Sequence, residues 1–207
     1  EHMSSVFYGC GRLTSIGVSS WNTKSVEDME FLFRDCSSLT TLDLSKWDTA
    51  AVTNMKSMFY GCGSLTSLDL SSWDTGKVSN MSQLFRDCSQ LTAIDVSSWN
   101  TESATDMFSM FYGCGNLTAL DLSGWNTGSV TDMSHMFFNC GRLASVYVGS
   151  GWNTDNVSSS GKMFEQCKKL KGGQGTSYDD GHTDKSYARI DGGTENPGYF
   201  TDIADKP

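Results

Sequence analysis

The chain has 207 residues, with 15 basic and 24 acidic side chains and a formal net charge of −9. Its basic residues form no cluster, and nucleic-acid binding requires a basic stripe that displaces counterions from phosphates, so we expect no nucleic-acid partner. No run of about 18 apolar residues is present, so we expect no transmembrane segment in this fragment.

A repeat of 26 residues runs along most of the chain. Cysteines and tryptophans mark it, at Cys10, Cys36, Cys62, Cys88, Cys114, Cys140 and Cys167, and at Trp21, Trp47, Trp73, Trp99, Trp125 and Trp152. A period of about 20 to 29 residues with the pattern L-x-x-L-x-L predicts a leucine-rich repeat solenoid, in which each unit buries its apolar face only against its neighbours. Because the chain begins inside a repeat, we expect it to be a fragment of a longer protein.

Each repeat is predicted to contain one short helix and one short strand. Between Val52 and Cys62, apolar residues recur at intervals of three and four, which predicts one face of a helix that begins near Thr53-Asn54. The last residues of the element Leu65–Leu70 predict a short strand, with Leu68 and Leu70 inward and Ser67, Asp69 and Ser71 outward. We expect nine positions to face the core: Val52, Met55, Met58, Phe59, Cys62, Leu65, Leu68, Leu70 and Trp73. The predicted fold class is therefore α/β, a leucine-rich repeat solenoid with parallel strands.

The chain divides into two predicted parts. Residues 1–170 form the leucine-rich repeat array of seven units, of which the first and last are incomplete, and residues 171–207 form a glycine-rich C-terminal cap or linker. In this tail, residues 187–190 predict a short strand. Together with Tyr199 and Phe200, it is expected to cover the open apolar end that every solenoid must close.

The seven cysteines are predicted to be reduced, buried thiols. Each repeat has one cysteine at the same place, and no C-x-x-C pair exists, so ligands for a zinc site do not converge. Free cysteine behaves as a small hydrophobic residue and is among the most buried types. We therefore expect neither disulfides nor a metal site.

The repeat motif resembles that of a known family. The pattern W-[DN]-T-x-x-V-[ST]-[DN]-M-x-x-M-F-x-x-C-x-x-L-T-x-L-D-L-S, seen for example from Trp125 to Cys140, closely resembles the repeats of the BspA-like leucine-rich repeat group of bacterial surface proteins. The resemblance covers residues 3 to 170. It implies a secreted, cell-surface protein of a bacterium, used in adhesion to host or neighbouring cells, and it supplies no catalytic residues.

A column of acidic side chains is expected on the outer face of the strands. It consists of Asp43, Asp69, Asp95 and Asp121, continues into Tyr147, and is flanked by a serine two residues after each aspartate. Two charges at roughly 5 Å repel by about 0.8 kcal/mol in water, so something must offset the repulsion. One interpretation is hydrogen bonds from neighbouring hydroxyl and N–H groups. The other is a row of sites for cations or for a basic partner, although no D-x-D-x-D loop indicates calcium.

A second exposed column alternates tyrosine and arginine. It runs through Tyr8, Arg34, Tyr60, Arg86 and Tyr112, and then Phe138. Neighbouring repeats would place a guanidinium against an aromatic ring, a cation–π ladder worth about 0.5 to 1 kcal/mol per exposed contact. Because tyrosine and arginine are enriched in binding hot spots, the same row, with Phe31 and Phe108, is also a candidate protein-contact surface.

No enzymatic activity or cofactor is predicted. The three histidines, His2, His135 and His182, have no nucleophile or carboxylate at a telling spacing, and no catalytic motif is present. Two functions stay open: an extracellular adhesion module that binds a protein or glycan on host or neighbouring cells, and a passive spacer that displays another domain. The resemblance favours adhesion, whereas the uniform columns favour the spacer. We expect a monomer.

Overall fold

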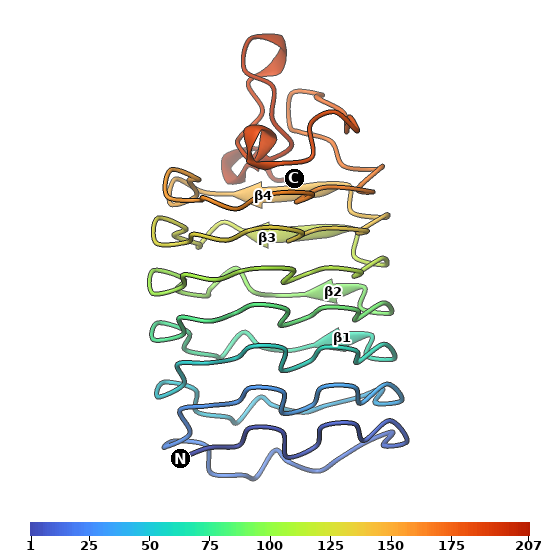
Figure 1. Cartoon of the computed structure of the whole chain (residues 1–207), viewed down its shortest axis with the longest axis vertical. Coiled ribbons are helices and arrows are strands. Elements are labelled where there is room, and N and C mark those ends of the chain that lie inside the picture. Colours follow the sequence, from blue (N-terminus) through green and yellow to red (C-terminus); the bar gives the residue numbers. More distant parts are fainter.

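The computed structural model describes residues 1–207 and consists of coils stacked along the long axis of the molecule (Figure 1). Each coil corresponds to one 26-residue repeat, and the tail folds over the C-terminal end of the stack. The elements in chain order are β1 Ser67–Leu68, β2 Ala93–Ile94, β3 Ala119–Leu122, β4 Ser145–Val148, η1 Lys185–Tyr187, η2 Gly193–Glu195, β5 Thr201–Asp202 and η3 Ile203–Asp205, where η denotes a 3-10 helix.

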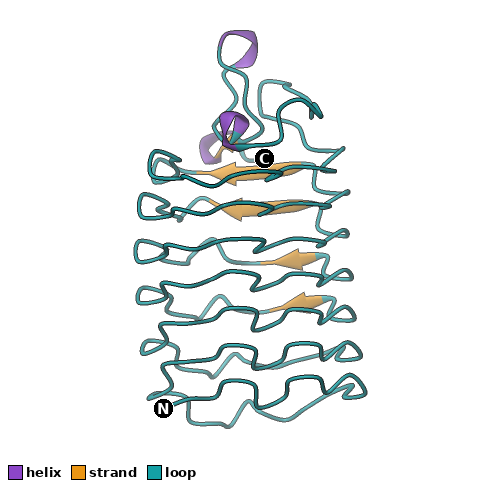
Figure 2. Ribbon diagram, in the orientation of Figure 1, coloured by secondary structure: helices purple, strands orange, loops and turns teal.

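Short parallel strands form where the leucine pattern predicted them. Strand β1 pairs with β2, and β3 pairs with β4, with Leu68 opposite Ile94 and Leu120 opposite Val146, each pair separated by one repeat. In Figure 2 the strands lie one above another along the stack. Leu120 and Leu122 point into the core and Ala119 is exposed, so the alternation expected for a half-buried strand is confirmed.

The predicted helix is absent, so the helical part of the predicted α/β fold class is wrong, whereas its short parallel strands are present. No α-helix occurs in the chain, and only three short 3-10 helices lie in the tail. In the segment expected to be helical, Ser57 and Gly61 have φ values of +53° and +73°, a left-handed conformation that an α-helix cannot contain. The N–H of Met55 donates to the carbonyl of Asn80 in the next coil at 3.0 Å, and that of Met58 donates three residues back. A series of turns thus buries residues at the same intervals as a helix face.

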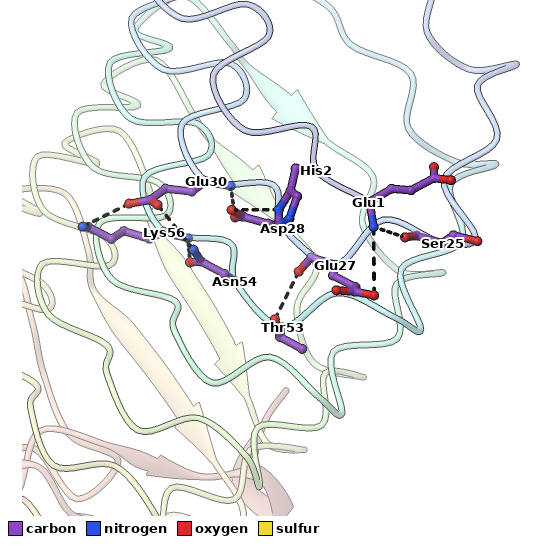
Figure 3. Close-up of polar contacts among 9 residues, drawn as sticks. All are labelled: Glu1, His2, Ser25, Glu27, Asp28, Glu30, Thr53, Asn54 and Lys56. Atoms are coloured by element: carbon purple, nitrogen blue, oxygen red, sulfur yellow. Dashed lines mark hydrogen bonds and ion pairs between the residues drawn. The ribbon is translucent and has the colours of Figure 1, made fainter.

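A second ladder of polar residues joins the coils along these turns. Single parallel bridges link His2, Asp28, Asn54, Asn80, Asp106, Asp132 and Ser159. Figure 3 shows its first rungs, where the Thr53 hydroxyl donates to the Glu27 carbonyl at 3.2 Å and Lys56 pairs with Glu30 at 3.1 Å. Thr53 and Asn54, expected to begin a helix, therefore connect one coil to its neighbour instead.

The core is a set of columns that continue through the stack. All nine positions predicted to face inward in the unit from Trp47 are buried, each at most 5% exposed. One phenylalanine per coil stacks nearly parallel on the next, with ring centroids 5.4 Å apart for Phe7 and Phe33 and 5.8 Å apart for Phe33 and Phe59. Each ring in the middle of the stack contacts one ring on either side, so its dispersion contacts depend on two neighbouring coils.

Polar side chains in the core bond between coils as well. The Thr49 hydroxyl donates to the carbonyl of Asp74 at 2.9 Å, and the indole N–H of Trp47 donates to the carbonyl of Val18 at 3.0 Å. The same two contacts recur in other coils, for example at Thr101 and Trp125. Buried donors cost free energy unless they are paired, so these bonds require the coils to stay in register.

Six cysteines form one buried column, and none forms a disulfide. Each thiol lies near a phenylalanine carbonyl of the preceding coil, at 3.1 Å for Cys62 and Phe33. Burial raises the pKa of Cys36 to about 11 and that of Cys167 to about 12. The prediction is wrong for Cys10, which lies in the first described coil and is exposed.

The tail covers the C-terminal end of the stack. Strand β5 pairs with β4, and Phe200 packs edge-on against Trp152 with ring centroids 5.0 Å apart. Tyr199 packs in the same way on Phe164. Tyr199 and Phe200 are fully buried, as expected for residues that close the apolar end. The strand predicted for residues 187–190 does not form, since η1 ends at Tyr187 and only a single bridge joins Ile190 to Phe200.

Thiol accessibility tests the cysteine column. We expect one thiol, that of Cys10, to react with a thiol reagent in the native protein, and all seven to react after denaturation. Intramolecular disulfides, or several reactive thiols in the native state, would contradict the column.

A matched pair of leucine substitutions tests the stacking. Leu65 is fully buried between two coils, whereas the equivalent Leu13 in the first coil is only partly buried. We expect Leu65→Ala to lower the free energy of unfolding by about 2 to 5 kcal/mol, because it leaves a cavity between close-packed coils. Leu13→Ala should cost clearly less. Equal losses in chemical denaturation would show that the two positions are packed alike.

Candidate functional site

The four aspartates predicted to form a column do so, and we call Asp43, Asp69, Asp95 and Asp121 the acidic ladder. Asp121 lies in β3, paired with Tyr147 of β4, and Asp69 and Asp95 follow β1 and β2 directly. Because the strands pair in a register of one repeat, equivalent side chains of consecutive coils lie one strand spacing apart, about 4.7 to 4.9 Å. The ladder is therefore a regular row of carboxylates.

Serine holds each of the first three carboxylates in place. The Oδ1 atoms of Asp43, Asp69 and Asp95 each accept a hydrogen bond of 2.7 Å from the hydroxyl of Ser45, Ser71 and Ser97, respectively. The backbone N–H of the same serine donates to the same oxygen. These two bonds, the hydroxyl bond first, lower the pKa of Asp43 and of Asp69. The hydrogen bonds expected from the neighbouring serines are therefore present, and both carboxylates are ionised at neutral pH.

Asp121 differs because a lysine of the tail contacts it. The Nζ atom of Lys206 lies 2.5 Å from the Oδ2 atom of Asp121 and 5.6 Å from the ring centroid of Tyr147. Burial opposes ionisation of Asp121, but the hydrogen bonds from Lys206 and Ser123 outweigh it and lower its pKa. Asp43, Asp69 and Asp95 form no ion pair.

The ladder lines two shallow depressions in the surface. One, of about 460 Å³, contains Asp43 and Asp69, and the other, of about 270 Å³, contains Asp95, Asp121 and Tyr147. No group of three or more histidine, cysteine, aspartate and glutamate side chains lies close enough to hold a metal ion. The carboxylates of the ladder are therefore separate groups and form no chelating cluster.

The second predicted column, which we call the Tyr/Arg ladder, consists of Tyr8, Arg34, Tyr60, Arg86 and Tyr112. The guanidinium carbon of Arg34 lies 4.3 Å from the ring centroid of Tyr60, and that of Arg86 lies 4.2 Å from that of Tyr112. On its other side Arg86 lies 5.3 Å from Tyr60. The predicted cation–π ladder is thus confirmed. About a quarter of each arginine side chain is exposed, 27% for Arg34 and 25% for Arg86.

Steric fit explains why the Tyr/Arg ladder alternates. Every arginine is followed by an aspartate and every tyrosine by a glycine, as at Arg34-Asp35 and Tyr60-Gly61. A Cβ atom at Gly61 would lie 2.5 Å from the Oδ1 atom of Asp35. A side chain at Gly61 would therefore have to displace the Asp35 carboxylate, which favours glycine beside each aspartate of the Tyr/Arg ladder.

One concave site was not identified from the sequence. A depression of about 330 Å³, which we call the aromatic pocket, is lined by Arg86, Phe108, Tyr112, His135, Phe138 and Lys162, together with Ser109. From the sequence, Phe108 was expected only to extend the Tyr/Arg ladder, and no role was predicted for His135. A comparison of equivalent positions between the repeats could have identified the aromatic pocket from the sequence, because Phe108, His135 and Phe138 all depart from the repeat pattern.

Comparison with known proteins identifies a family. The model of the family described as "Mycoplasma protein of unknown function, DUF285" matches residues 1–91 and 66–178. Searches among curated proteins and among solved structures found no match. The structure contains no helix of the length and apolar character needed to cross a membrane.

A serine substitution tests how the acidic ladder is held. We expect Ser71→Ala to raise the pKa of Asp69 toward its ordinary value, because the carboxylate loses a hydrogen-bond donor. Folding lowers this pKa, so the stability that Asp69 contributes is present above the unfolded pKa and is lost as the pH falls through the folded one. The variant should reduce that contribution.

NMR titration of the Asp69 carboxyl measures the effect. Ser72→Ala is the control, since the Ser72 hydroxyl donates to the backbone carbonyl of Ser45 and not to an aspartate. The same Asp69 pKa in the parent and in Ser71→Ala would rule out the serine bond as its cause.

Proposed function

The chain belongs to the DUF285 family, and on this premise we propose that it is an extracellular, cell-surface adhesion module of a bacterium. In this proposal it is not an enzyme, and it binds a protein or glycan on host or neighbouring cells through the surface of its coils. We also propose that its repeats belong to the BspA-like leucine-rich repeat group and form a solenoid of that type. The repeat motif from Trp125 to Cys140 supports this assignment.

The observation that carries the proposal is the acidic ladder. Asp43, Asp69 and Asp95 lie in register without a cationic partner, and serine fixes the direction of each carboxylate before any ligand arrives. Preorganised groups lose little conformational entropy on binding, which favours their use in recognition. A partner with basic side chains would supply the charges that the ladder lacks.

The contact of Lys206 illustrates how a basic side chain fits this surface. Its ammonium group bonds Asp121 and lies near the face of Tyr147, so a single lysine uses one carboxylate and one aromatic ring of the next coil. A partner whose basic residues follow the spacing of the ladder could repeat the carboxylate contact at several rungs. Contacts that are individually weak add through avidity when they bind together.

The alternative function is a passive spacer that holds another domain away from the cell surface. The near-identical coils, joined by hydrogen bonds in a fixed register, favour it, because a rigid rod needs no variation between repeats. A spacer would bind no partner through its ladders. A binding measurement therefore separates the two functions.

A double substitution in the ladder tests the proposal. We expect Asp69→Asn with Asp95→Asn to weaken binding to a lysine-rich peptide by about tenfold and to flatten its salt dependence, because two charges of the row are lost. Asparagine retains an acceptor oxygen for Ser71 and Ser97. Affinity is measured by isothermal titration calorimetry at several salt concentrations.

The control is Asp48→Asn with Asp74→Asn, which removes the same charge from exposed positions outside the ladder, where other repeats carry asparagine. It should bind the peptide nearly as well as the parent. Equal losses of peptide affinity in both double variants would show that net charge, and not the acidic ladder, determines binding. If the parent protein does not bind the peptide, the spacer function is favoured.

A further inference from the structure

Three departures from the repeat pattern meet in the aromatic pocket. Phe108 stands where other coils carry serine, lysine, glutamate or glycine, and His135 stands where they carry serine, phenylalanine, glutamine or lysine. Phe138 interrupts the alternation of tyrosine and arginine. Elsewhere the columns are nearly uniform, so this part of the surface differs from the rest of the stack in both sequence and shape.

Aromatic rings form the walls of the aromatic pocket. Tyr112 and Phe138 stack with ring centroids 4.7 Å apart and planes within 6° of each other. His135 meets Phe108 edge-on, with centroids 5.8 Å apart and an interplanar angle of 76°. The volume of about 330 Å³ lies at the lower end of the range of small-molecule sites, about 300 to 1,000 Å³. The rings leave space for a small cyclic group between them.

The polar groups of the aromatic pocket are donors and unpaired atoms, and no carboxylate lines it. Arg86 and Lys162 supply positive charge, and each also pairs with a carboxylate outside the lining, Asp87 at 3.5 Å and Glu165 at 3.4 Å. The hydroxyl of Ser109, a fully buried residue, and the Nδ1 atom of His135 are both buried without a hydrogen-bond partner. A buried polar atom left unpaired destabilises the fold, so a ligand that bonds these atoms recovers that free energy. Burial first, and then Lys162, lowers the pKa of His135, so its ring is neutral at pH 7.

We propose that the aromatic pocket binds a carboxylated sugar ring of a glycan. The C–H face of the ring packs on Phe108 and Phe138, and its hydroxyl groups bond the free atoms of Ser109 and His135. Its carboxylate faces Arg86 and Lys162, and charge-assisted hydrogen bonds from arginine to carboxylate are among the strong ones in proteins. A purely apolar ligand would leave the buried polar atoms unpaired.

This inference rests on the proposed function, since it specifies the partner of an adhesion module as an acidic glycan, but its residues are separate from the acidic ladder. The carboxylated ring has two sources in glycans, the sialic acids and the uronic acids. Both carry a carboxylate on a sugar ring, and the probes distinguish them.

Four probes test the inference by isothermal titration calorimetry. They are sialyllactose, an oligosaccharide of alternating glucuronic acid and N-acetylglucosamine, neutral lactose, and a glutamate-rich peptide. We expect at least one carboxylated sugar to bind about tenfold or more tightly than lactose and the peptide. In NMR spectra, the ring protons of His135 should shift as the sugar saturates the site.

Variants that restore the repeat pattern locate the site. Phe108→Ser introduces the residue found at Ser82 and Ser134, and we expect it to weaken sugar binding by about tenfold, because a wall of the aromatic pocket is lost. Arg86→Gln should also weaken it. The matched control Lys56→Ser changes the equivalent of Phe108 in a distant coil and should bind the sugar like the parent. Melting temperatures establish that each variant is folded.

The results separate this inference from the proposed function. The double variant Asp69→Asn with Asp95→Asn should bind the sugar like the parent. If it loses binding of the lysine-rich peptide but keeps binding of the sugar, the result bears on the acidic ladder and not on the aromatic pocket. The aromatic pocket assignment is overturned if neither carboxylated sugar binds better than lactose, if the glutamate peptide binds as well as the sugars, or if folded Phe108→Ser binds like the parent.

Discussion

The hydrogen bonds between consecutive coils are the interaction on which the rest of the structure depends. Backbone N–H groups donate to carbonyls of the next coil in the same pattern along the stack, as from Met55 to Asn80 and from Met81 to Asp106, both at 3.0 Å. This fixed register places equivalent side chains directly above one another. Once it holds, any residue that is favourable in one coil is favourable in the next, which selects a sequence of near-identical units.

Register also explains where the molecule is regular and where it is not. The buried thiols, threonine hydroxyls such as that of Thr49, and the indole N–H groups of Trp47, Trp99 and Trp125 bond to an adjacent coil, so a coil without a neighbour loses such bonds. At the C-terminal end, Tyr199 and Phe200 replace the missing neighbour, and both are fully buried. In the first described coil, Val6, Tyr8 and Trp21 are exposed. Stability is therefore distributed along the stack, with the central coils most constrained.

The same register produces two kinds of surface. Where the repeat is uniform, it displays rows of like groups, the acidic ladder and the Tyr/Arg ladder, which suit partners with a matching periodicity. Where the repeat departs from its pattern, at Phe108, His135 and Phe138, the departures lie in neighbouring coils and so combine into one concave site. A stack of coils can thus carry an extended uniform surface and a local pocket without any change in its backbone.

The sequence by itself determined the period, the inward positions, the buried cysteines of the inner coils, and both exposed columns, because a strict repeat makes equivalent residues neighbours whatever the local backbone. It did not determine that backbone: burial at intervals of three and four from Val52 to Cys62 suits a helix face and a series of turns equally well. Only the tertiary structure decided between them, since the left-handed residues Ser57 and Gly61 are stabilised by hydrogen bonds to another coil. The contact of Lys206 with Asp121 and the aromatic pocket likewise depend on distances between segments that no repeat pattern contains.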